Sequence, residues 1–449
     1  MNQPSPQLYS PTKNPGVLRR PPLTALAAAL IAGWFVAGSA QAIEFGPEGM
    51  LTLTGFAEFT ATGVNNQCKG CQYDKDTDRQ RIWTDDVVPG KKITTRTVGF
   101  NQFQPYLGLN YNLGKGFKLN GMLSQRWRDG SEDVPGFWYE KNLGVSHEDY
   151  GGVRVGHMTT RAWAMTDYPY VSPFGLSDSF ASTGAAYGML TNAIRYTSPV
   201  FDVAQGDLVV EFTHDSGKAG FTVHKPRFSE VWVHYGKGDL VLDAMFQDSK
   251  NGGPVAWGHA PFTGVAYDAK HDALNGGSSQ GVAMLMGRYK WTSQLEFTVA
   301  GRRNQWSGAY AVIIDPVGPQ WNNMFNVNWG GYLNGVANPG YAASSNDWML
   351  GASYKFGKWT AATGMVHLGK AKTDNPMERG QTNSALVNTA RLGYDLGRGF
   401  QAYGQAGMVH FNKQGLAPLS MPAHDAIKQI DSRITNAGNW FGVGLLYVF

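Results

Sequence analysis

The two cysteines of the chain stand in one short motif, Cys68-Lys69-Gly70-Cys71. This spacing can form a small disulfide, carry redox chemistry or supply part of a metal site. The next residue is Gln72 and not His, which excludes a haem-attachment motif, and two cysteines alone cannot complete a four-ligand structural zinc site. If the chain is exported, a disulfide between Cys68 and Cys71 is favoured. A redox role stays open, although no thioredoxin-like βαβ pattern surrounds the motif.

Histidines are the next groups that could do chemistry, as bases of a hydrolase. The candidates are His214, His234, His259, His271 and His367. We expect no nucleophile elbow, the strand-to-helix turn of a Gly-x-Ser-x-Gly hydrolase, to accompany them. His259, Asp268, His271 and Asp272 could suggest a metal loop, but their spacing is generic and we interpret them as solvated loop residues. The sequence therefore predicts no enzyme, no cofactor and no metal site.

The charges of the chain are nearly balanced once its N-terminal segment is set aside. There are 38 Lys and Arg and 34 Asp and Glu, and three of the cations but none of the anions precede residue 43. The remainder therefore carries 35 cations against 34 anions. Nucleic acid is not an expected partner, because its binding requires a clearly basic face.

The N-terminal segment has the three parts of an export signal. Lys13, Arg19 and Arg20 form a basic region, an apolar stretch covers 23–36, and Ala40-Gln41-Ala42 is a small-residue cleavage site. We expect residues 1–42 to be a cleaved signal peptide and the mature chain to begin near Ile43. The alternative, an anchoring transmembrane helix, fits less well because the apolar run breaks at Gly38-Ser39.

These groups must be positioned by strands, because the rest of the chain alternates between apolar and polar residues. No later run approaches the roughly 20 apolar residues of a membrane helix. The sequence predicts about sixteen strands. They cover 50–62, 101–112, 117–130, 138–147, 153–161, 192–201, 208–215, 231–235, 240–247, 282–290, 294–305, 347–356, 359–369, 386–396, 400–411 and 440–449.

The connections between the expected strands alternate in length. Short turns that contain Gly alternate with long segments, which cover 63–96, 162–191, 249–280, 307–346, 370–384 and 412–439. A transmembrane β-barrel has tight periplasmic turns and longer extracellular loops, whereas a soluble sandwich has no reason to sort its loops by side. The pattern predicts an all-β, antiparallel transmembrane barrel over residues 43–449.

The last strand supports a lipid-facing wall. Phe441, Val443, Leu445, Tyr447 and Phe449 occupy one face of an uncharged segment. A soluble protein rarely leaves such an edge at its terminus, because its unpaired backbone invites aggregation. Closure of a barrel in lipid removes the edge and covers the apolar face. We expect this strand to close the barrel against residues 50–62.

Three short motifs resemble the Gram-negative general porins, the sixteen-stranded trimeric type of β-proteobacteria. They are Leu113-Gly114-Lys115-Gly116-Phe117-Lys118, Tyr150-Gly151-Gly152-Val153-Arg154-Val155-Gly156-His157 and Asn192-Ala193-Ile194-Arg195-Tyr196-Thr197-Ser198-Pro199, and the terminal Phe449 also matches. The resemblance implies an outer-membrane homotrimer, surrounded by outer-membrane lipids, that passes small hydrophilic solutes. It also implies that Phe449 is read by the insertion machinery.

The resemblance further implies that the third external loop, residues 162–191, folds into the barrel and narrows it. Asp167 and Asp178 are its charged residues, and Lys and Arg are missing from it. An acidic loop opposite basic wall residues makes a transverse field across a narrow pore. The expected wall residues are Arg96, Arg126, Arg154, Arg195 and, with less weight, Arg128. His157 stands where related porins often carry Arg, so it could respond to mild acid or be a neutral wall residue.

Three alternatives to a general diffusion channel stay open at this point. The aromatic-rich segment 321–348 could cover the entrance and make the channel specific for one nutrient. A barrel enzyme, either a lipase or a protease, would need a nucleophile and base on the wall. An adhesin with a plugged lumen would need a longer inserted segment than residues 162–191.

Overall fold

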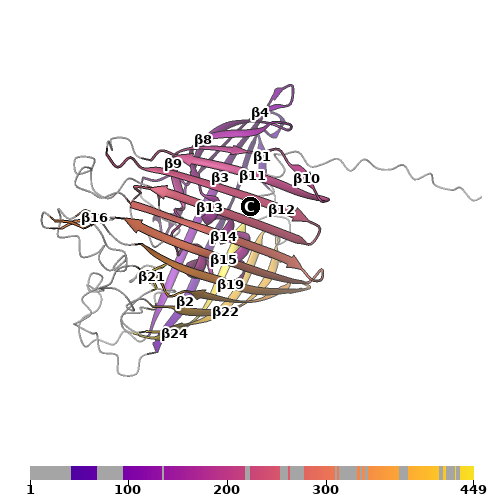
Figure 1. The fold of residues 1–449 in the computed structure, drawn as a ribbon. Coiled ribbons are helices and arrows are strands. Elements are labelled where there is room, and N and C mark those ends of the chain that lie inside the picture. The colour runs from indigo at the N-terminus through magenta and orange to yellow at the C-terminus, as the bar shows by residue number, and fades with distance from the viewer. Residues whose placement is uncertain are drawn as a thin grey trace, which may run out of the picture.

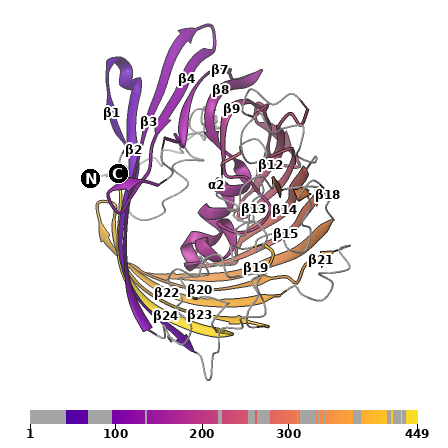
Figure 2. The same cartoon turned by 90° about the vertical axis from the view of Figure 1, so that its left-hand side faces the viewer.

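The computed structural model places sixteen antiparallel strands in one closed barrel (Figures 1 and 2). The structure describes residues 42–67, 95–133, 136–217, 223–252, 261–262, 278–308, 311–312, 331–333, 336–338, 342–373, 383–413, 418–420, 430 and 435–449. The helices among them are all too short or too polar to cross a bilayer. The expected signal peptide, the cysteine pair and most of segment 321–348 lie outside the described residues.

The barrel strands follow one another around the wall in chain order. They are β2 (Leu51–Gln67), β3 (Thr95–Gly114), β4 (Phe117–Ser124), β7 (Glu140–His147), β8 (Gly151–Thr159), β9 (Met189–Thr197), β11 (Gly206–Asp215), β12 (Arg227–Lys237), β13 (Leu240–Lys250), β14 (Ser278–Lys290), β15 (Leu295–Gly308), β19 (Ala343–Phe356), β20 (Trp359–Leu368), β22 (Ala385–Gly397), β23 (Phe400–Phe411) and β24 (Ala437–Val448). Every strand expected from the sequence is present, and β24 closes the ring against β2, as predicted.

Short elements complete the fold. They are β1 (Ile43–Phe45), β5 (Trp127–Arg128), β6 (Ser131–Glu132), β10 (Phe201–Val203), β16 (Ala311–Val312), β17 (Gly331–Leu333), β18 (Val336–Asn338), β21 (Lys372–Thr373), the helix α2 (Arg161–Met165) and the single turns η1 (Pro47–Gly49), η3 (Thr166–Val171), η4 (Ser172–Phe174) and η5 (Ser177–Ala181). The turns η3, η4 and η5 follow α2 directly in the third loop.

Several predicted strand ends differ from the structure, and two of them bear on the external loops. The strand expected over 153–161 stops at Thr159, because Thr160 caps a helix that begins at Arg161. The strand expected over 117–130 breaks after Ser124, where Gln125 and Arg126 are buried and the chain resumes as the β5–β6 hairpin. Both breaks occur where the chain leaves the wall to form an external loop.

The two faces of the wall differ as the alternation predicts. On β13, Leu242 and Phe246 are exposed on the outside while Asp243 and Gln247 are buried inside. Aromatic rings gather where the short turns lie, with 4.6 Å between the ring centroids of Trp359 and Tyr394. Apolar walls edged by aromatic rings are typical of outer-membrane barrels.

Candidate functional site

The third loop lies inside the barrel. Figure 2 shows α2 within the ring of strands, beside the wall made by β12 and β13. The backbone N–H of Trp163 donates to Oγ1 of Thr160 over 3.2 Å, which caps the first turn of α2. Ala162, Ala164 and Met165 are buried. Because its apolar side is covered by the wall, the loop is packed and does not hang free in the lumen.

Sulfur-containing and aromatic side chains fill the space between the loop and the wall. Met284 and Met286 of β14 are buried there, and Oγ1 of Thr166 contacts Sδ of Met284 over 3.1 Å. Phe174 of η4 is buried against Gly351 and Gly364. An added Cβ would overlap the Phe174 ring at Gly351 and the Leu176 side chain at Gly364. Flexible thioethers fill irregular gaps well, so this layer fits the loop closely to the wall.

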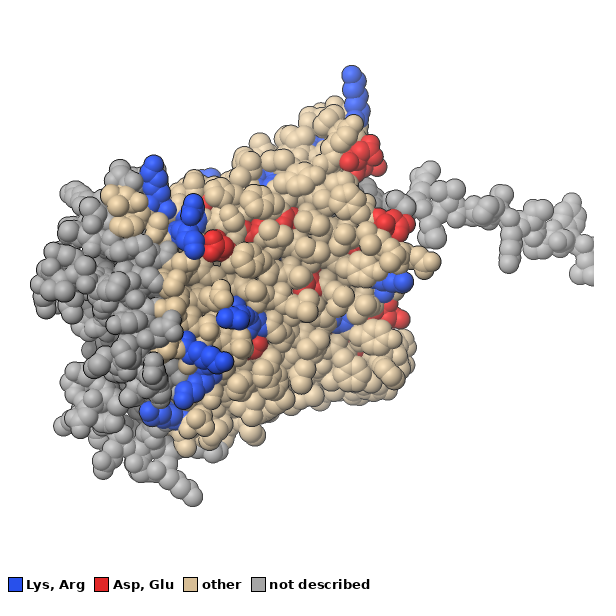
Figure 3. Space-filling view, viewed as in Figure 1, with Lys and Arg blue, Asp and Glu red and all other residues tan. Residues whose placement is uncertain are grey.

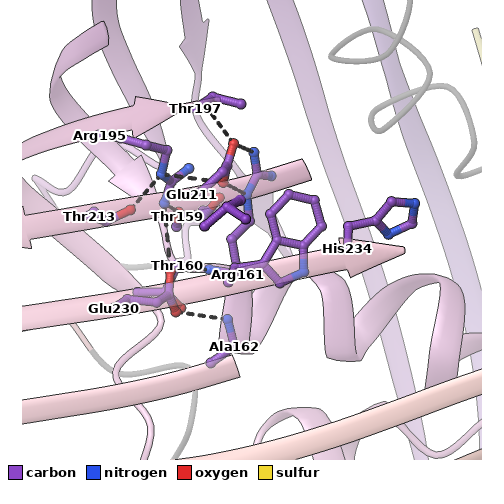
Figure 4. Close-up of polar contacts among 12 residues, drawn as sticks. Thr159, Thr160, Arg161, Ala162, Arg195, Thr197, Glu211, Thr213, Glu230 and His234 are labelled. Carbon is purple, nitrogen blue, oxygen red and sulfur yellow. Dashed lines mark hydrogen bonds and ion pairs between the residues drawn. The ribbon is translucent and has the colours of Figure 1, made fainter. Parts of the chain in front are cut away.

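A buried charge network holds the start of the loop (Figure 4). Nη2 of Arg161 donates to Oε1 of Glu211 over 2.9 Å. The backbone N–H groups of Arg161 and Ala162 donate to the carboxylate of Glu230 over 2.8 and 3.0 Å. Nη2 of Arg195 donates to the carbonyl of Thr159 over 2.7 Å. Two carboxylates and two guanidinium groups therefore fix the point at which the chain leaves β8.

A second cluster holds the end of the loop. Nε of Arg302 donates to Oδ2 of Asp347 over 2.9 Å, and both side chains are almost fully buried. Nη1 of the same guanidinium donates to the carbonyls of Phe180 and Thr183 over 2.5 and 2.6 Å. A Cβ on Gly184 would lie 2.8 Å from Cζ of Arg302, so a glycine is required where the guanidinium passes.

Tyrosine and serine groups fix the middle of the loop. The hydroxyl of Tyr170 donates to Oδ2 of Asp243 over 2.5 Å, and the same carboxylate accepts from Nε1 of Trp232 over 2.9 Å. Nδ1 of His234 lies 2.9 Å from Oδ1 of Asp243. A half-buried histidine therefore sits at the edge of the lumen, joined to the loop through one carboxylate.

The two acidic loop residues, Asp167 and Asp178, are in different surroundings. Oδ1 of Asp167 accepts from the Ser172 hydroxyl over 3.0 Å and lies within electrostatic range of Arg126. Burial raises the pKa of Asp167 above its ordinary value, and the nearby Asp178 adds to the increase. Asp178 itself is exposed and within electrostatic range of Tyr403.

The wall across from Asp178 carries its own polar groups. Tyr403 of β23 donates its hydroxyl proton to Oε1 of Glu58 over 2.5 Å, and Gln102 donates to the other oxygen of that carboxylate over 2.7 Å. Cζ of Arg391 lies 3.6 Å from the centroid of the Tyr403 ring, and its Nη1 donates to the carbonyl of Ser172 over 3.2 Å. Arg391 thus reaches from β22 to the loop.

Arg126 forms an ion pair with Asp133 close to the loop. Its Nε donates to Oδ2 of Asp133 over 2.9 Å, and its Cζ lies 4.5 Å from the ring centroid of Tyr139 and 5.4 Å from that of Trp163. Arg128 also contacts Asp133, with 3.1 Å between Nη1 and Oδ1. One carboxylate therefore offsets part of the positive charge of both arginines.

The remaining predicted wall residues are in different surroundings. Arg195 is buried in the network at the start of the loop, with 3% of its side chain exposed. Arg154 faces the lumen and makes no hydrogen bond or ion pair within the described part of the chain. His157 is half-buried, with its ring 5.6 Å from that of Phe137. Arg96 pairs with Val64 in the β2–β3 ladder, and its side chain is outside the described residues.

The structure describes some of the sequence motifs that could suggest a hydrolase, a metal site or a disulfide. The segment Gly277-Ser278-Ser279-Gln280-Gly281 has a Gly-x-Ser-x-Gly spelling. Ser279 lies in the strand β14, with its Oγ 2.6 Å from Nζ of Lys250. It is therefore no strand-to-helix elbow. Within the described ranges, no three His, Cys, Asp or Glu side chains are grouped as a metal site would require. The disulfide between Cys68 and Cys71 stays a prediction.

Sequence reasoning missed the residues that hold the loop. Arg161 was expected in a strand, and Arg302, Asp347 and Arg391 were not singled out as site residues. The inward direction of Arg302 could have been predicted. Arg302 is an even number of residues from Thr298 and Glu296 on β15, so the three side chains lie on the same, inward face. Its partners on the loop could not be deduced, because they lie 119 to 122 residues away in the chain.

Comparisons with known proteins agree with this architecture. A model of the Gram-negative porin family matches residues 24–414. No curated protein matches the chain by sequence. The anion-selective porin from Comamonas acidovorans has a similar fold, with 13% identity, a TM-score of 0.55 and coverage of 89% of this chain and 99% of that one. The trimer form of OmpT from Vibrio cholerae has 12% identity, a TM-score of 0.54 and coverage of 89% and 99%.

The family match covers most of the described barrel, and the closed ring of sixteen strands with an internal third loop agrees with it. The strands cross the outer membrane, and the lumen offers a route for passive diffusion. The chain belongs to the Gram-negative porin family and is an outer-membrane channel.

Proposed function

We propose that the third loop forms the narrowest part of the channel and that Asp167 and Asp178 set its ion preference. The observation that carries this proposal is the fixed position of the loop inside the barrel, with Asp178 exposed and Asp167 within electrostatic range of Arg126. Small hydrophilic solutes pass this point by diffusion, and the proposal includes no reaction step.

The charges facing Asp167 and Asp178 come from two arginines in this proposal. Arg126 is partly offset by Asp133, whereas Arg391 contacts the Tyr403 ring and a loop carbonyl. Charges on opposite sides of a narrow, low-dielectric passage make a transverse field that favours polar solutes. Arg154 adds a positive charge to the lumen wall, while Arg195 acts as an anchor of the loop.

Planar-bilayer recordings of the refolded protein test this function. Wild-type protein should give conductance steps, and reversal potentials in a KCl gradient give its ion preference. The double substitution Asp167→Asn and Asp178→Asn should move the reversal potential toward that of chloride. Asp239→Asn, in the exposed turn between β12 and β13, is the control and should leave the reversal potential unchanged. No steps above background would exclude the channel, and an unchanged potential in the double variant would exclude this placement of the constriction.

We also propose that the channel is a homotrimer. The similar OmpT from Vibrio cholerae is described as a trimer form, and this barrel exposes apolar side chains such as Phe441 and Val443 on its outer wall. Light scattering of the detergent-solubilised protein, corrected for bound detergent, should give three times the mass of the mature chain. A monomeric mass at micromolar concentration would contradict the proposal.

A cleaved leader is the last part of the proposal. The basic residues, apolar stretch and Ala40-Gln41-Ala42 motif support removal of residues 1–42 during export. N-terminal sequencing of protein purified from outer membranes should begin at Ile43. A sequence that begins before residue 23 would contradict this site.

A further inference from the structure

Arg154 of β8 is a cation of the lumen that the network at the start of the loop does not use. Its side chain is half-exposed and makes no hydrogen bond or ion pair with the residues that the structure describes. Its cross-strand neighbour Arg195 is turned toward the loop instead, where it donates to Thr213 and Thr159 (Figure 4). A guanidinium has five N–H donors, so those of Arg154 remain available to a solute.

Glycines surround Arg154 on the inner face of the wall. Gly152 and Gly156 precede and follow it at two-residue spacing on β8, and Gly144 of β7 pairs with it. A Cβ on Gly144 would overlap Cγ of Arg154, so the stem of the arginine lies across this glycine. Because these three positions carry no side chain, they leave room for a ligand beside the guanidinium.

Further hydrogen-bonding groups lie next to this guanidinium. Ser146 is two residues from Gly144 on the same face of β7, and its Oγ accepts from Nδ2 of Asn120 over 3.0 Å. The Ser146 hydroxyl therefore keeps its own proton for an acceptor in the lumen. Asn120 pairs with Gly144 from β4, on the side opposite to Arg154. A ligand above Gly144 can therefore reach Arg154 on one strand and Ser146 on the next.

The inward-facing residues around Arg154 are basic or neutral. They form two rows across β4, β7, β8 and β9, which are Asn120, Gly144, Arg154 and Arg195, and then Lys118, Ser146, Gly152 and Thr197. Neither row contains Asp or Glu. The carboxylates within electrostatic range of Arg154 belong to Glu211 and Glu140, which already accept hydrogen bonds from Arg161 and Thr159. Such surroundings suit an anion that accepts hydrogen bonds.

The position of Arg154 separates it from the loop along the channel. The strand β8 begins at Gly151 after a short turn, at the periplasmic end of the barrel, and ends at Thr159 beside the loop. Arg154 is five residues before Thr159, or about 17 Å along a strand. Figure 3 shows an outer wall of mostly uncharged side chains, and Arg154 points away from that wall. A solute therefore reaches Arg154 through the periplasmic half of the lumen.

We propose that Arg154, Ser146 and Lys118 form an anion-binding site in the periplasmic half of the lumen, which takes the carboxylate group of small organic acids. The guanidinium of Arg154 binds both carboxylate oxygens, the Ser146 hydroxyl donates to one of them, and Lys118 adds longer-range attraction. A planar carboxylate matches the planar, two-pronged guanidinium. The site is distinct from the constriction proposed above and needs neither Asp167 nor Asp178.

Gluconate and sorbitol are suitable probes, because each has six carbons and only gluconate carries a carboxylate. Gluconate added on the periplasmic side of a bilayer should briefly interrupt the single-channel current of the wild type, whereas sorbitol should not. Arg154→Gln should shorten the mean interruption about ten-fold, and Ser146→Ala about three-fold. Arg398→Gln, in the exposed turn between β22 and β23 at the same end of the barrel, is the control and should behave like the wild type.

Arg154→Lys tests the two-pronged contact, because it keeps the charge and loses the planar fork. Its interruptions should be longer than those of Arg154→Gln and shorter than those of the wild type. The Asp167→Asn/Asp178→Asn variant should still be interrupted by gluconate like the wild type, which separates this site from the constriction. Saturation-transfer NMR of gluconate with the detergent-solubilised protein measures the same contact without any current.

Equal interruptions in the wild type and Arg154→Gln, or equal NMR signals from the two proteins, would overturn the site. Interruptions by sorbitol as long as those by gluconate would show that no charge is recognised and would also overturn it. Longer interruptions by inorganic phosphate than by gluconate would overturn the assignment to carboxylates.

Discussion

Arg302 of β15 and Asp347 of β19 form a buried ion pair, with 2.9 Å between Nε and Oδ2. Asp347 also accepts from Nδ2 of Asn304 over 2.7 Å and from the backbone N–H of Gly369 over 2.8 Å. The remaining donors of Arg302 hold the end of the third loop. One pair of side chains therefore joins the barrel wall, the internal loop and the chain that follows β20.

Arg302→Gln should destabilise the barrel by about 3–5 kcal/mol, because it leaves the Asp347 carboxylate buried without its cation. It should also release the carbonyls of Phe180 and Thr183, so that single-channel current becomes noisier. Urea unfolding and bilayer recordings measure the two effects. Arg303→Gln is the matched control, since the neighbouring arginine faces outward. Quiet current together with wild-type stability would show that the ion pair does not position the loop.

Glu211→Gln should lower the free energy of unfolding by about 3–5 kcal/mol, because Arg161 and Arg195 both lose a buried counter-charge. The double variant with Arg161→Met should lose less than the sum of the two single variants, since the two residues share one contact. A double-mutant cycle from urea unfolding measures the difference. Strict additivity would mean that the pair is not coupled in the folded protein.

The ion preference of the channel should change as the pH falls. The change should occur at a higher pH than the titration of an ordinary aspartate. Burial raises the pKa of Asp167 above about 3.9, so this residue loses its negative charge earlier as the pH falls. The permeability to cations relative to chloride should decline with it. Reversal potentials measured between pH 7 and pH 4 follow the titration. The transition should persist in Asp178→Asn and disappear in Asp167→Asn, and its survival in Asp167→Asn would contradict this assignment.

Gly444→Ala should destabilise the barrel by about 1–3 kcal/mol, as overpacking does. A Cβ at this position of β24 would overlap the ring of Tyr403, which lies across the strand toward Glu58. Gly99→Ala is the control, because its Cβ would meet no atom within 4 Å. Urea unfolding should show no loss for Gly444→Ala in a Tyr403→Ser background. A loss that persists there would place its cause elsewhere.

The strands of the barrel wall could be predicted from the sequence because each strand is recognised from its own residues. Apolar and polar residues alternate along β13 and β15, and a short turn precedes each strand, with Gly238 in the turn before β13. The direction of each face followed from the cost of placing charge in lipid. No long-range information was needed for these features.

The interior of the loop could not be predicted in this way. Residues 162–191 are apolar enough to be buried, but which wall they pack against depends on contacts such as Thr389 to Phe174, 215 residues apart in the chain. The sequence identified Arg195 as a basic wall residue, yet its neighbours Glu211 and Glu230 are on strands whose register cannot be deduced from the sequence. Arg195 and Arg154 are the same residue type, and they differ in function because Arg195 lies beside Glu211 and Glu230 whereas Arg154 faces the lumen.

The closure of the barrel by pairing of β24 with β2 has a consequence for its biogenesis. The hydrogen bond between Tyr403 and Glu58 joins residues 345 positions apart, and β24 pairs with β2 over most of its length. Until the last residues of the chain are present, β2 has one unpaired edge that can recruit other strands. A truncated product that lacks β24 therefore cannot be a smaller working pore. It should be an open sheet that aggregates or is degraded, so quality control can act on one event, the pairing of β24 with β2, at the end of barrel assembly.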